Sequence, residues 1–156
     1  MKELMEYREK LLARLSAAEE EFCEACRSFA NPFASVDGEW TVHQVAFHVG
    51  GIHREVYGAR VLRTFHEENP LIKNFEPEEW MVAIYSREEP LENILTEFST
   101  SIQAICVLLG NAPQESWSRL SQHEALGKEL TLQLWAERGL AHIEDHLKSL
   151  KKAQNP

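Results

Sequence analysis

Cysteine, positive charge and long apolar runs are all scarce in this sequence. Its three cysteines are an odd number in a chain of 156 residues, and with no export signal a disulfide framework is not expected. No run of 18 apolar residues predicts a membrane span, and the start MKELMEYREKLLARL carries charges where a signal peptide needs an apolar stretch. These absences predict a soluble, cytoplasmic protein with no membrane partner.

The cysteines that are present, Cys23, Cys26 and Cys106, do not form a recognisable reactive motif. Cys23 and Cys26 have C-x-x-C spacing, but LSAAEEEFCEACRSF reads as the interior of an amphipathic helix, where no helix terminus lowers a thiol pKa. No second cysteine pair is available to complete a zinc site. We expect both side chains to be packed in the core rather than used in redox or metal chemistry.

Acidic residues outnumber basic ones. The chain has 25 Asp and Glu residues against 16 Lys and Arg residues, which gives a formal net charge of -9. This is the wrong sign for a protein that binds phosphate backbones, so nucleic acid is not an expected partner. The length is that of one domain, residues 1–156, which is large enough to bury most of its apolar surface.

Four segments have helical periodicity, and none has the strict alternation of a half-buried strand. These segments span about residues 2–30, 41–66, 87–110 and 129–152. Thr41 and Gln44 have the spacing of a capping box at the start of the second segment, and Gly110 is the expected C-cap of the third. The pattern predicts an all-α protein with the architecture of a four-helix bundle.

The strongest candidates for chemistry are His142 and His146 on the last helix. They are separated by about 400 degrees of helical rotation, so both rings project from one face and can bind one ion. Alone, the pair is at least as typical of a solvated helix face. It is not a zincin motif, because Glu144 stands two positions after His142 and points away. No Glu has a His three residues later, which excludes a ferritin-like di-iron site.

A reactive metal site with three protein ligands needs one more residue. Among the other histidines, His48 is the best placed, because it lies among apolar residues on the second helix, where an apolar residue would be expected. The remaining histidines stand near helix ends or beside charged residues, and we expect them to face solvent: His43, His53, His66 and His123.

The positions of the three histidines along their helices predict a topology. At about 1.5 Å per residue, His48 lies roughly 10 Å beyond the cap at Thr41, and His142 and His146 lie roughly 9 to 15 Å before the end of the last helix. The three rings share a layer if helices two and four are antiparallel. That arrangement requires an up-down-down-up order with a long crossover between helices 2 and 3. The connector at 67–86 is long enough, and PEEWMVAIY within it predicts a short helix.

In order and spacing, EWTVHQVAFHV, the crossover and TLQLWAERGLAHIEDHLKSL resemble the DinB/YfiT-like superfamily of metal-dependent bundle proteins. The family marks fall on Trp40, Thr41, His48, His142 and His146, and the likeness covers nearly the whole chain. The resemblance implies an up-down-down-up bundle, a three-histidine site for a divalent metal ion such as zinc or nickel, and a homodimer. It also implies a transferase or isomerase that uses a low-molecular-weight thiol as cosubstrate.

Three neutral imidazoles would leave a divalent ion its full charge, which stabilises a bound thiolate or activates water. We therefore expect a small-thiol-dependent S-transferase, or a related hydrolase or isomerase, acting on a small-molecule substrate. Arg138 and Trp135 precede His142 on roughly its face and are candidate substrate-binding residues, although a surface salt bridge is the more common role for such an arginine. Gly139 is expected to leave room beside the metal. The alternatives are a non-catalytic metal-binding stress or interaction protein and a metal-free bundle.

Overall fold

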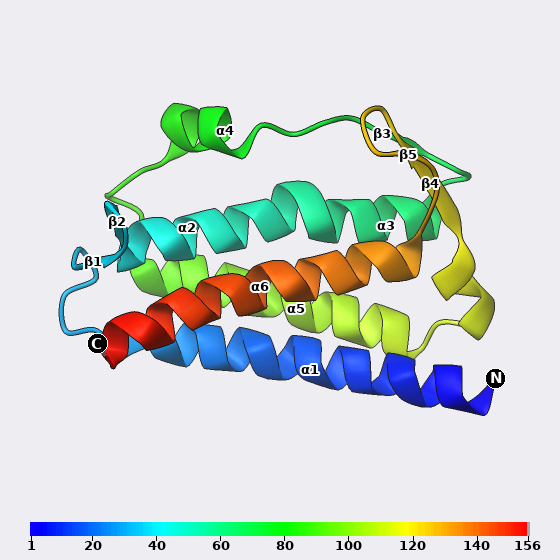
Figure 1. The fold of residues 1–156 in the computed structure, drawn as a ribbon, viewed down its shortest axis with the longest axis horizontal. Coiled ribbons are helices and arrows are strands. Elements are labelled where there is room, and N and C mark those ends of the chain that lie inside the picture. Colours follow the sequence, from blue (N-terminus) through cyan, green and yellow to red (C-terminus); the bar gives the residue numbers. More distant parts are fainter. Residues whose placement is uncertain (156) are drawn as a thin grey trace.

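The computed structural model describes residues 1–155, and its helices form a bundle (Figure 1). The first long helix is α1 (Lys2–Arg27). The second is continuous through α2 (Val42–Ile52), a π-helical turn (His53–Tyr57) and α3 (Gly58–His66). The third and fourth are α5 (Leu91–Gly110) and α6 (Leu132–Gln154). The predicted four-helix architecture is confirmed.

The helices follow the up-down-down-up order. Helix α1 packs against α5 and α6, α2 packs against α5, and α3 packs against α6. In Figure 1, α1 and α6 run in one direction while α2–α3 and α5 run in the other. The chain returns from the end of α3 to the start of α5 through residues 67–90, which contain the short helix α4 (Pro77–Ile84). The predicted crossover and its short helix are therefore both present, and α2 is antiparallel to α6.

Apolar side chains from all four long helices fill the interior. Helix α5 has the length and composition of a membrane span, with a mean hydropathy of 1.2, but it contributes core residues to this bundle. Its buried apolar side chains are Ile94, Leu95, Phe98, Ile102, Ile105 and Leu109. The cysteine prediction is confirmed, since Cys23 and Cys26 are buried in the same core. Burial raises the pKa of Cys23 to about 12 and raises that of Cys26 further.

The predicted capping box fixes the start of α2. The Thr41 hydroxyl accepts a hydrogen bond from the Gln44 backbone N–H at 3.1 Å, and the Gln44 side-chain oxygen accepts one from the Thr41 backbone N–H at 2.9 Å. Two of the donors that a helix start leaves unpaired are thereby satisfied. This cap sets the position of His48 along the bundle.

Short strands also occur outside the bundle, although no segment of the sequence has the alternation of a half-buried strand. Strands β1 (Ser35–Asp37) and β2 (Trp40–Thr41) pair antiparallel before α2. Strand β4 (Leu120–His123) pairs parallel with β3 (Leu71–Ile72) and antiparallel with β5 (Gly127–Thr131). Segments of two to five residues are too short to show a clear alternation.

Two predicted helix ends also differ from the structure. Helix α6 begins at Leu132 rather than at 129, because residues 127–131 form β5 and the Thr131 side chain caps the helix by accepting from the Leu134 backbone N–H at 3.1 Å. Helix α5 includes Gly110, and its C-cap is Asn111 in a right-handed conformation with φ of -98°. The connection from α5 to α6 therefore does not begin with a glycine in the left-handed backbone conformation. A single 3-10 turn at Gln114–Ser118 follows instead.

Candidate functional site

The bundle brings His48, His142 and His146 together, and we refer to these residues as the three-histidine cluster. His48 comes from α2, and the other two come from α6. One ring nitrogen from each residue can be chosen so that all three lie within 4.8 Å of one another. The Nε2 atoms of His48 and His142 are 3.1 Å apart. The layer that helix geometry predicted from the sequence is therefore formed.

The surroundings keep the three imidazoles neutral. Burial lowers the pKa of His48 to about 4, with a smaller effect from His146. Burial, followed by the other histidines, lowers the pKa of His142 to about 3. Burial also lowers the pKa of His146, although Asp37 and Asp145 oppose this shift. A neutral imidazole keeps the lone pair that a metal ion requires, so the cluster is in its ligand form near neutral pH.

The geometry of the cluster fits a divalent ion. Two nitrogens that bind one ion tetrahedrally at about 2.0–2.1 Å lie roughly 3.3 Å apart, close to the 3.1 Å between Nε2 of His48 and Nε2 of His142. His48 is only 8% exposed, and its Nδ1 atom is buried with no hydrogen-bond partner among residues 1–155. With the ring proton on Nδ1, the lone pair of His48 lies on Nε2, which is the atom that faces His142 and could bind an ion.

Tyr57 lies beside the cluster at the end of the π-helical turn. Its ring centroid is 5.4 Å from that of His142. A Cβ atom at Gly139 would lie 3.2 Å from Cβ of Tyr57, so only glycine gives the tyrosine this position comfortably. Gly139 was expected to leave room beside the metal, and the structure fills that room with Tyr57. Single π-helical turns are frequent at functional sites because they redirect the side chains that follow them.

The cluster opens toward the crossover. A cavity of about 480 Å³ reaches His48 and is bordered by Trp40 and by the start of α4 at residues 76–79. The Trp40 ring packs edge-on against His48, with 5.0 Å between centroids. Three of the bordering residues at 76–79 are glutamates. Helix α4 therefore forms a mostly acidic rim over the entrance.

Helix α4 is attached to the bundle by few side chains. Met81 is buried, and Trp80 packs against Phe47 with 5.6 Å between ring centroids. The Trp80 ring also occupies the space above Gly51, where any Cβ atom would overlap it. Farther along the crossover, His43 accepts from the Tyr85 hydroxyl at 2.8 Å and donates to the Glu89 carbonyl at 2.6 Å.

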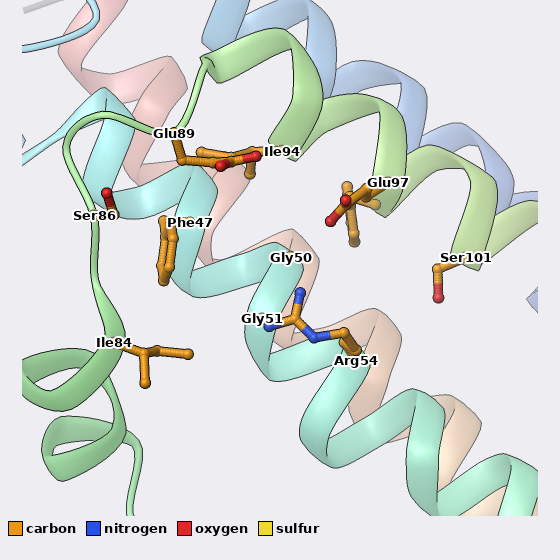
Figure 2. Close-up of a pocket in the computed structure, with 11 residues that line it drawn as sticks. Phe47, Gly50, Gly51, Arg54, Ile84, Ser86, Glu89, Ile94, Glu97 and Ser101 are labelled. Atoms are coloured by element: carbon orange, nitrogen blue, oxygen red, sulfur yellow. The ribbon is translucent and has the colours of Figure 1, made fainter.

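A second cleft lies on another face of α2 and is shown in Figure 2. Its volume is about 390 Å³, and it lies between α2, α5 and the end of the crossover. Phe47, Gly50, Gly51 and Arg54 of the second helix line it, opposite Glu97 and Ser101 of α5. No member of the three-histidine cluster lines this cleft. The cavity beside His48 is therefore the one that serves the candidate site.

Three of the four histidines expected to face solvent are buried, with exposed fractions of 2% for His43, 5% for His53 and 4% for His123. That prediction was wrong for three different reasons. The crossover covers His43, His53 packs against Phe98 of α5 with 5.9 Å between ring centroids, and β4 carries His123 into the interface with α6. His66 is exposed, as expected.

The structure places the predicted substrate-binding residues away from the cavity beside His48. Trp135 is fully buried, and its indole N–H donates to the Ser121 hydroxyl at 2.8 Å. This corrects its assignment as a substrate-binding residue, because β4 covers its ring. Arg138 is exposed and forms no ion pair with any carboxylate of residues 1–155. Glu144 forms an ion pair with Arg14 of α1, which agrees with its exclusion from the site.

Sequence reasoning did not find Tyr57, Asp37 or the glutamates of α4. Asp37 in β1 is close enough to His146 to oppose, without reversing, the lowering of its pKa by burial. Tyr57 carries no motif of its own, and only a π-helical turn, which regular periodicity does not reveal, brings it to His142. The segment PEEWMVAIY predicted the helix α4, but nothing in the sequence indicated that its glutamates would border the cavity beside His48.

Comparisons with known proteins identify a family and a similar fold. The family model of the DinB superfamily matches residues 3–150. A relative from Oceanobacillus iheyensis, named "Putative metal-dependent hydrolase OB0782", is 30% identical over 112 residues, which are 68% of this chain and 64% of the relative. The chain thus matches slightly less than two thirds of the relative's length.

The solved structure of YfiT from Bacillus subtilis is similar to this fold, with a TM-score of 0.81 and 20% sequence identity. The match covers 96% of this chain and 86% of the YfiT chain. That protein is described as "a probable metal-dependent hydrolase with an unusual four-helix bundle topology". At this identity, the similarity shows a shared fold.

Proposed function

Because this chain belongs to the DinB superfamily, we propose that it is a divalent-metal-dependent hydrolase of small molecules, with His48, His142 and His146 as the metal ligands. The observation that carries the proposal is the meeting of three neutral imidazoles, His48 buried and His142 and His146 half-buried, from helices almost a hundred residues apart, with their ligand atoms within 4.8 Å. The names of the Oceanobacillus iheyensis relative and of YfiT favour hydrolysis over group transfer.

When bound, a divalent ion such as zinc or nickel would polarise a substrate carbonyl and lower the pKa of water or of a thiol beside it. The chain's own residues would hold the ligand and restrict its approach. Trp40 offers an aromatic wall next to His48, and α4 narrows the entrance to the cavity. The Asp37 carboxylate adds negative charge close to His146. Three protein ligands leave one tetrahedral position for a reactant, which is the arrangement of catalytic rather than structural zinc sites.

The visible spectrum of the cobalt-substituted chain tests whether that position is open. If the chain is a hydrolase, the spectrum is expected to change as the pH is raised through neutrality, because a water in the open position would lose a proton in this pH range. A spectrum that changes with neither pH nor added ligands would contradict the proposal and would favour an ion that only links α2 to α6.

Turnover separates hydrolysis from the thiol-dependent transfer that the sequence led us to expect. A hydrolase is expected to cleave an ester or amide substrate without any added thiol. Product formed only when a small thiol is present, with the thiol incorporated in the product, would instead assign a thiol cosubstrate. The predicted homodimer is checked separately by sedimentation velocity of the same sample.

A further inference from the structure

Arg60 of α3 is a buried cation without an anionic partner. Its side chain is 8% exposed and packs on the Trp135 ring, with 4.8 Å from the guanidinium carbon to the ring centroid. No carboxylate of residues 1–155 forms an ion pair with it. A buried charge that lacks a partner is costly, and buried arginines are normally paired. The lack is notable in a chain with 25 acidic residues.

The one polar side-chain atom in range of Arg60 does not accept a hydrogen bond from it. Nη2 of Arg60 lies 3.3 Å from Nε2 of His123. Nδ1 of His123 already accepts the backbone N–H groups of Ala125 at 3.0 Å and Leu126 at 3.1 Å. Those two donors require a lone pair on Nδ1, which places the proton of the neutral ring on Nε2. Arg60 and His123 therefore turn two N–H donors toward each other with no acceptor between them.

The neighbouring side chains add positive charge. Arg138 of α6 lies over the same indole, 5.8 Å from the Trp135 ring centroid, and has no carboxylate partner among the described residues. Burial and Arg138 both lower the pKa of Arg60, while Tyr57 raises it. Glu124 is next to His123 in sequence, but its carboxylate accepts from the Asn74 backbone N–H. Nothing in the described chain supplies the acceptor that these donors need.

The other buried arginine provides the contrast. Arg8 of α1 is 6% exposed and also lies over a tryptophan, 5.4 Å from the Trp117 ring centroid. Its guanidinium donates to the Gln133 side chain at 2.9 Å and to the backbone and side-chain oxygens of Gln114 at 3.1 and 3.0 Å. Arg8 is thus a satisfied structural arginine. Arg60 has the same burial and the same aromatic support but no acceptor.

We propose that Arg60, His123 and Arg138 form an oxyanion site that binds a carboxylate or phosphate group of a small ligand. Two guanidinium groups and an imidazole N–H supply several donors to one planar or tetrahedral anion, and charged hydrogen bonds of this kind are the strongest available to a protein. Among residues 1–155, the buried side-chain nitrogens that lack a hydrogen-bond partner belong to His48 and His53, and none belongs to Arg60. The N–H groups of Arg60 that have no protein partner are therefore accessible to solvent.

The oxyanion site is separate from the three-histidine cluster. Arg138 precedes His142 by four residues, or about 6 Å along α6, but neither Arg138 nor Arg60 borders the cavity beside His48. Tyr57 packs beside His142 and is close enough to Arg60 to affect its pKa. The oxyanion site therefore does not depend on the proposed metal-dependent function.

Titration calorimetry of the metal-free full-length chain tests the oxyanion site independently of any metal. Inorganic phosphate and propionate are the probes, with ionic strength held constant by sodium chloride, and the tighter probe identifies the kind of oxyanion. We expect saturable binding of one probe molecule per chain, weakened at least tenfold in Arg60→Met and severalfold in Arg138→Gln. Arg8→Met and the exposed Arg14→Gln are controls and should bind as the parent does.

Two results would overturn the proposal: no saturable binding of either probe to the parent, or equal affinity in Arg60→Met. If that variant does not fold, the side-chain Nε–H resonance of Arg60 in the parent decides, since it must shift during the titration and not with chloride. Loss of metal binding with intact phosphate or propionate binding would contradict only the proposed function. The reverse outcome would contradict only the oxyanion site.

Discussion

Replacement of Gly51 by alanine should release α4 from the bundle while leaving the bundle itself intact. A Cβ atom at this position would overlap the outer ring of Trp80. The overlapping atoms are the far end of a side chain on the crossover, so displacement of Trp80 relieves the overlap at little cost to α2. Helix α4 would then keep Met81 as its only buried side chain.

The two opposing contributions can be compared. Alanine in a helix interior is more favourable than glycine by about 0.8–1.0 kcal/mol, which acts on α2. Full burial of a large apolar side chain contributes about 1.5–3 kcal/mol, and the half-buried Trp80 should contribute roughly half of that, or about 0.8–1.5 kcal/mol. The global free energy of unfolding should therefore change by less than about 1 kcal/mol. Amide exchange in α4 should become roughly four- to twelvefold faster.

Hydrogen exchange of residues 77–85 measures the local effect, and urea unfolding measures the global one. Gly50→Ala is the matched control, because its Cβ atom would make ordinary contacts of 3.7 Å with Ile94 and Phe98 and would not reach Trp80. Unchanged exchange in α4 of Gly51→Ala would refute the idea that Trp80 holds this helix. Global destabilisation by more than about 2 kcal/mol would show that α2 cannot accept the substitution.

Three further predictions concern single side chains. Burial lowers the pKa of His53 to about 4, below the unfolded value of about 6.5. The stability that His53 contributes above pH 6.5 should thus decline as the pH falls toward 4, by up to about 3 kcal/mol. The pKa values of His48 and His142 are lowered in the same direction, so His53→Leu should reduce, and not abolish, the loss of stability between pH 7 and 4.5 in urea unfolding. Glu144→Gln should leave metal content unchanged and shift unfolding by less than about 1 kcal/mol, because its ion pair with Arg14 is largely exposed; metal loss would restore Glu144 as a site residue. Cys23 and Cys26 should react with a thiol reagent at pH 8 only after denaturation, since burial raises both pKa values, and rapid labelling of the native chain would contradict their packing.

The sequence allowed the histidine layer to be predicted because a helix has a fixed rise per residue. The cap at Thr41 gave His48 a known height, and the spacing of His142 and His146 placed both on one face. Only an antiparallel pairing of their helices brings those heights together. The long crossover is the physical consequence of that pairing, so two features of the sequence predicted one topology.

The errors arose where distant segments decide the outcome. His43 is covered by Tyr85 and Glu89, which lie in the part of the crossover between α4 and α5, about 40 residues later in the sequence. His53 was expected to face solvent because the charged Arg54 follows it, but a charged neighbour in the sequence points to another face of the helix and does not show where His53 lies. Trp135 was placed correctly around α6, but the angle around a helix does not tell whether a strand covers that face. Strand β4 covers the Trp135 ring, and the Ser121 hydroxyl of this strand accepts a hydrogen bond from the indole N–H.

Metal content is the most direct test of the three-histidine site. The purified chain is dialysed against zinc, and the bound ion is counted by elemental analysis beside His48→Ala and the exposed-histidine control His66→Ala. The site predicts one ion per chain in the parent and in His66→Ala, and a dissociation constant raised at least a hundredfold in His48→Ala. Equal zinc in all three samples, or none in the parent, would contradict it.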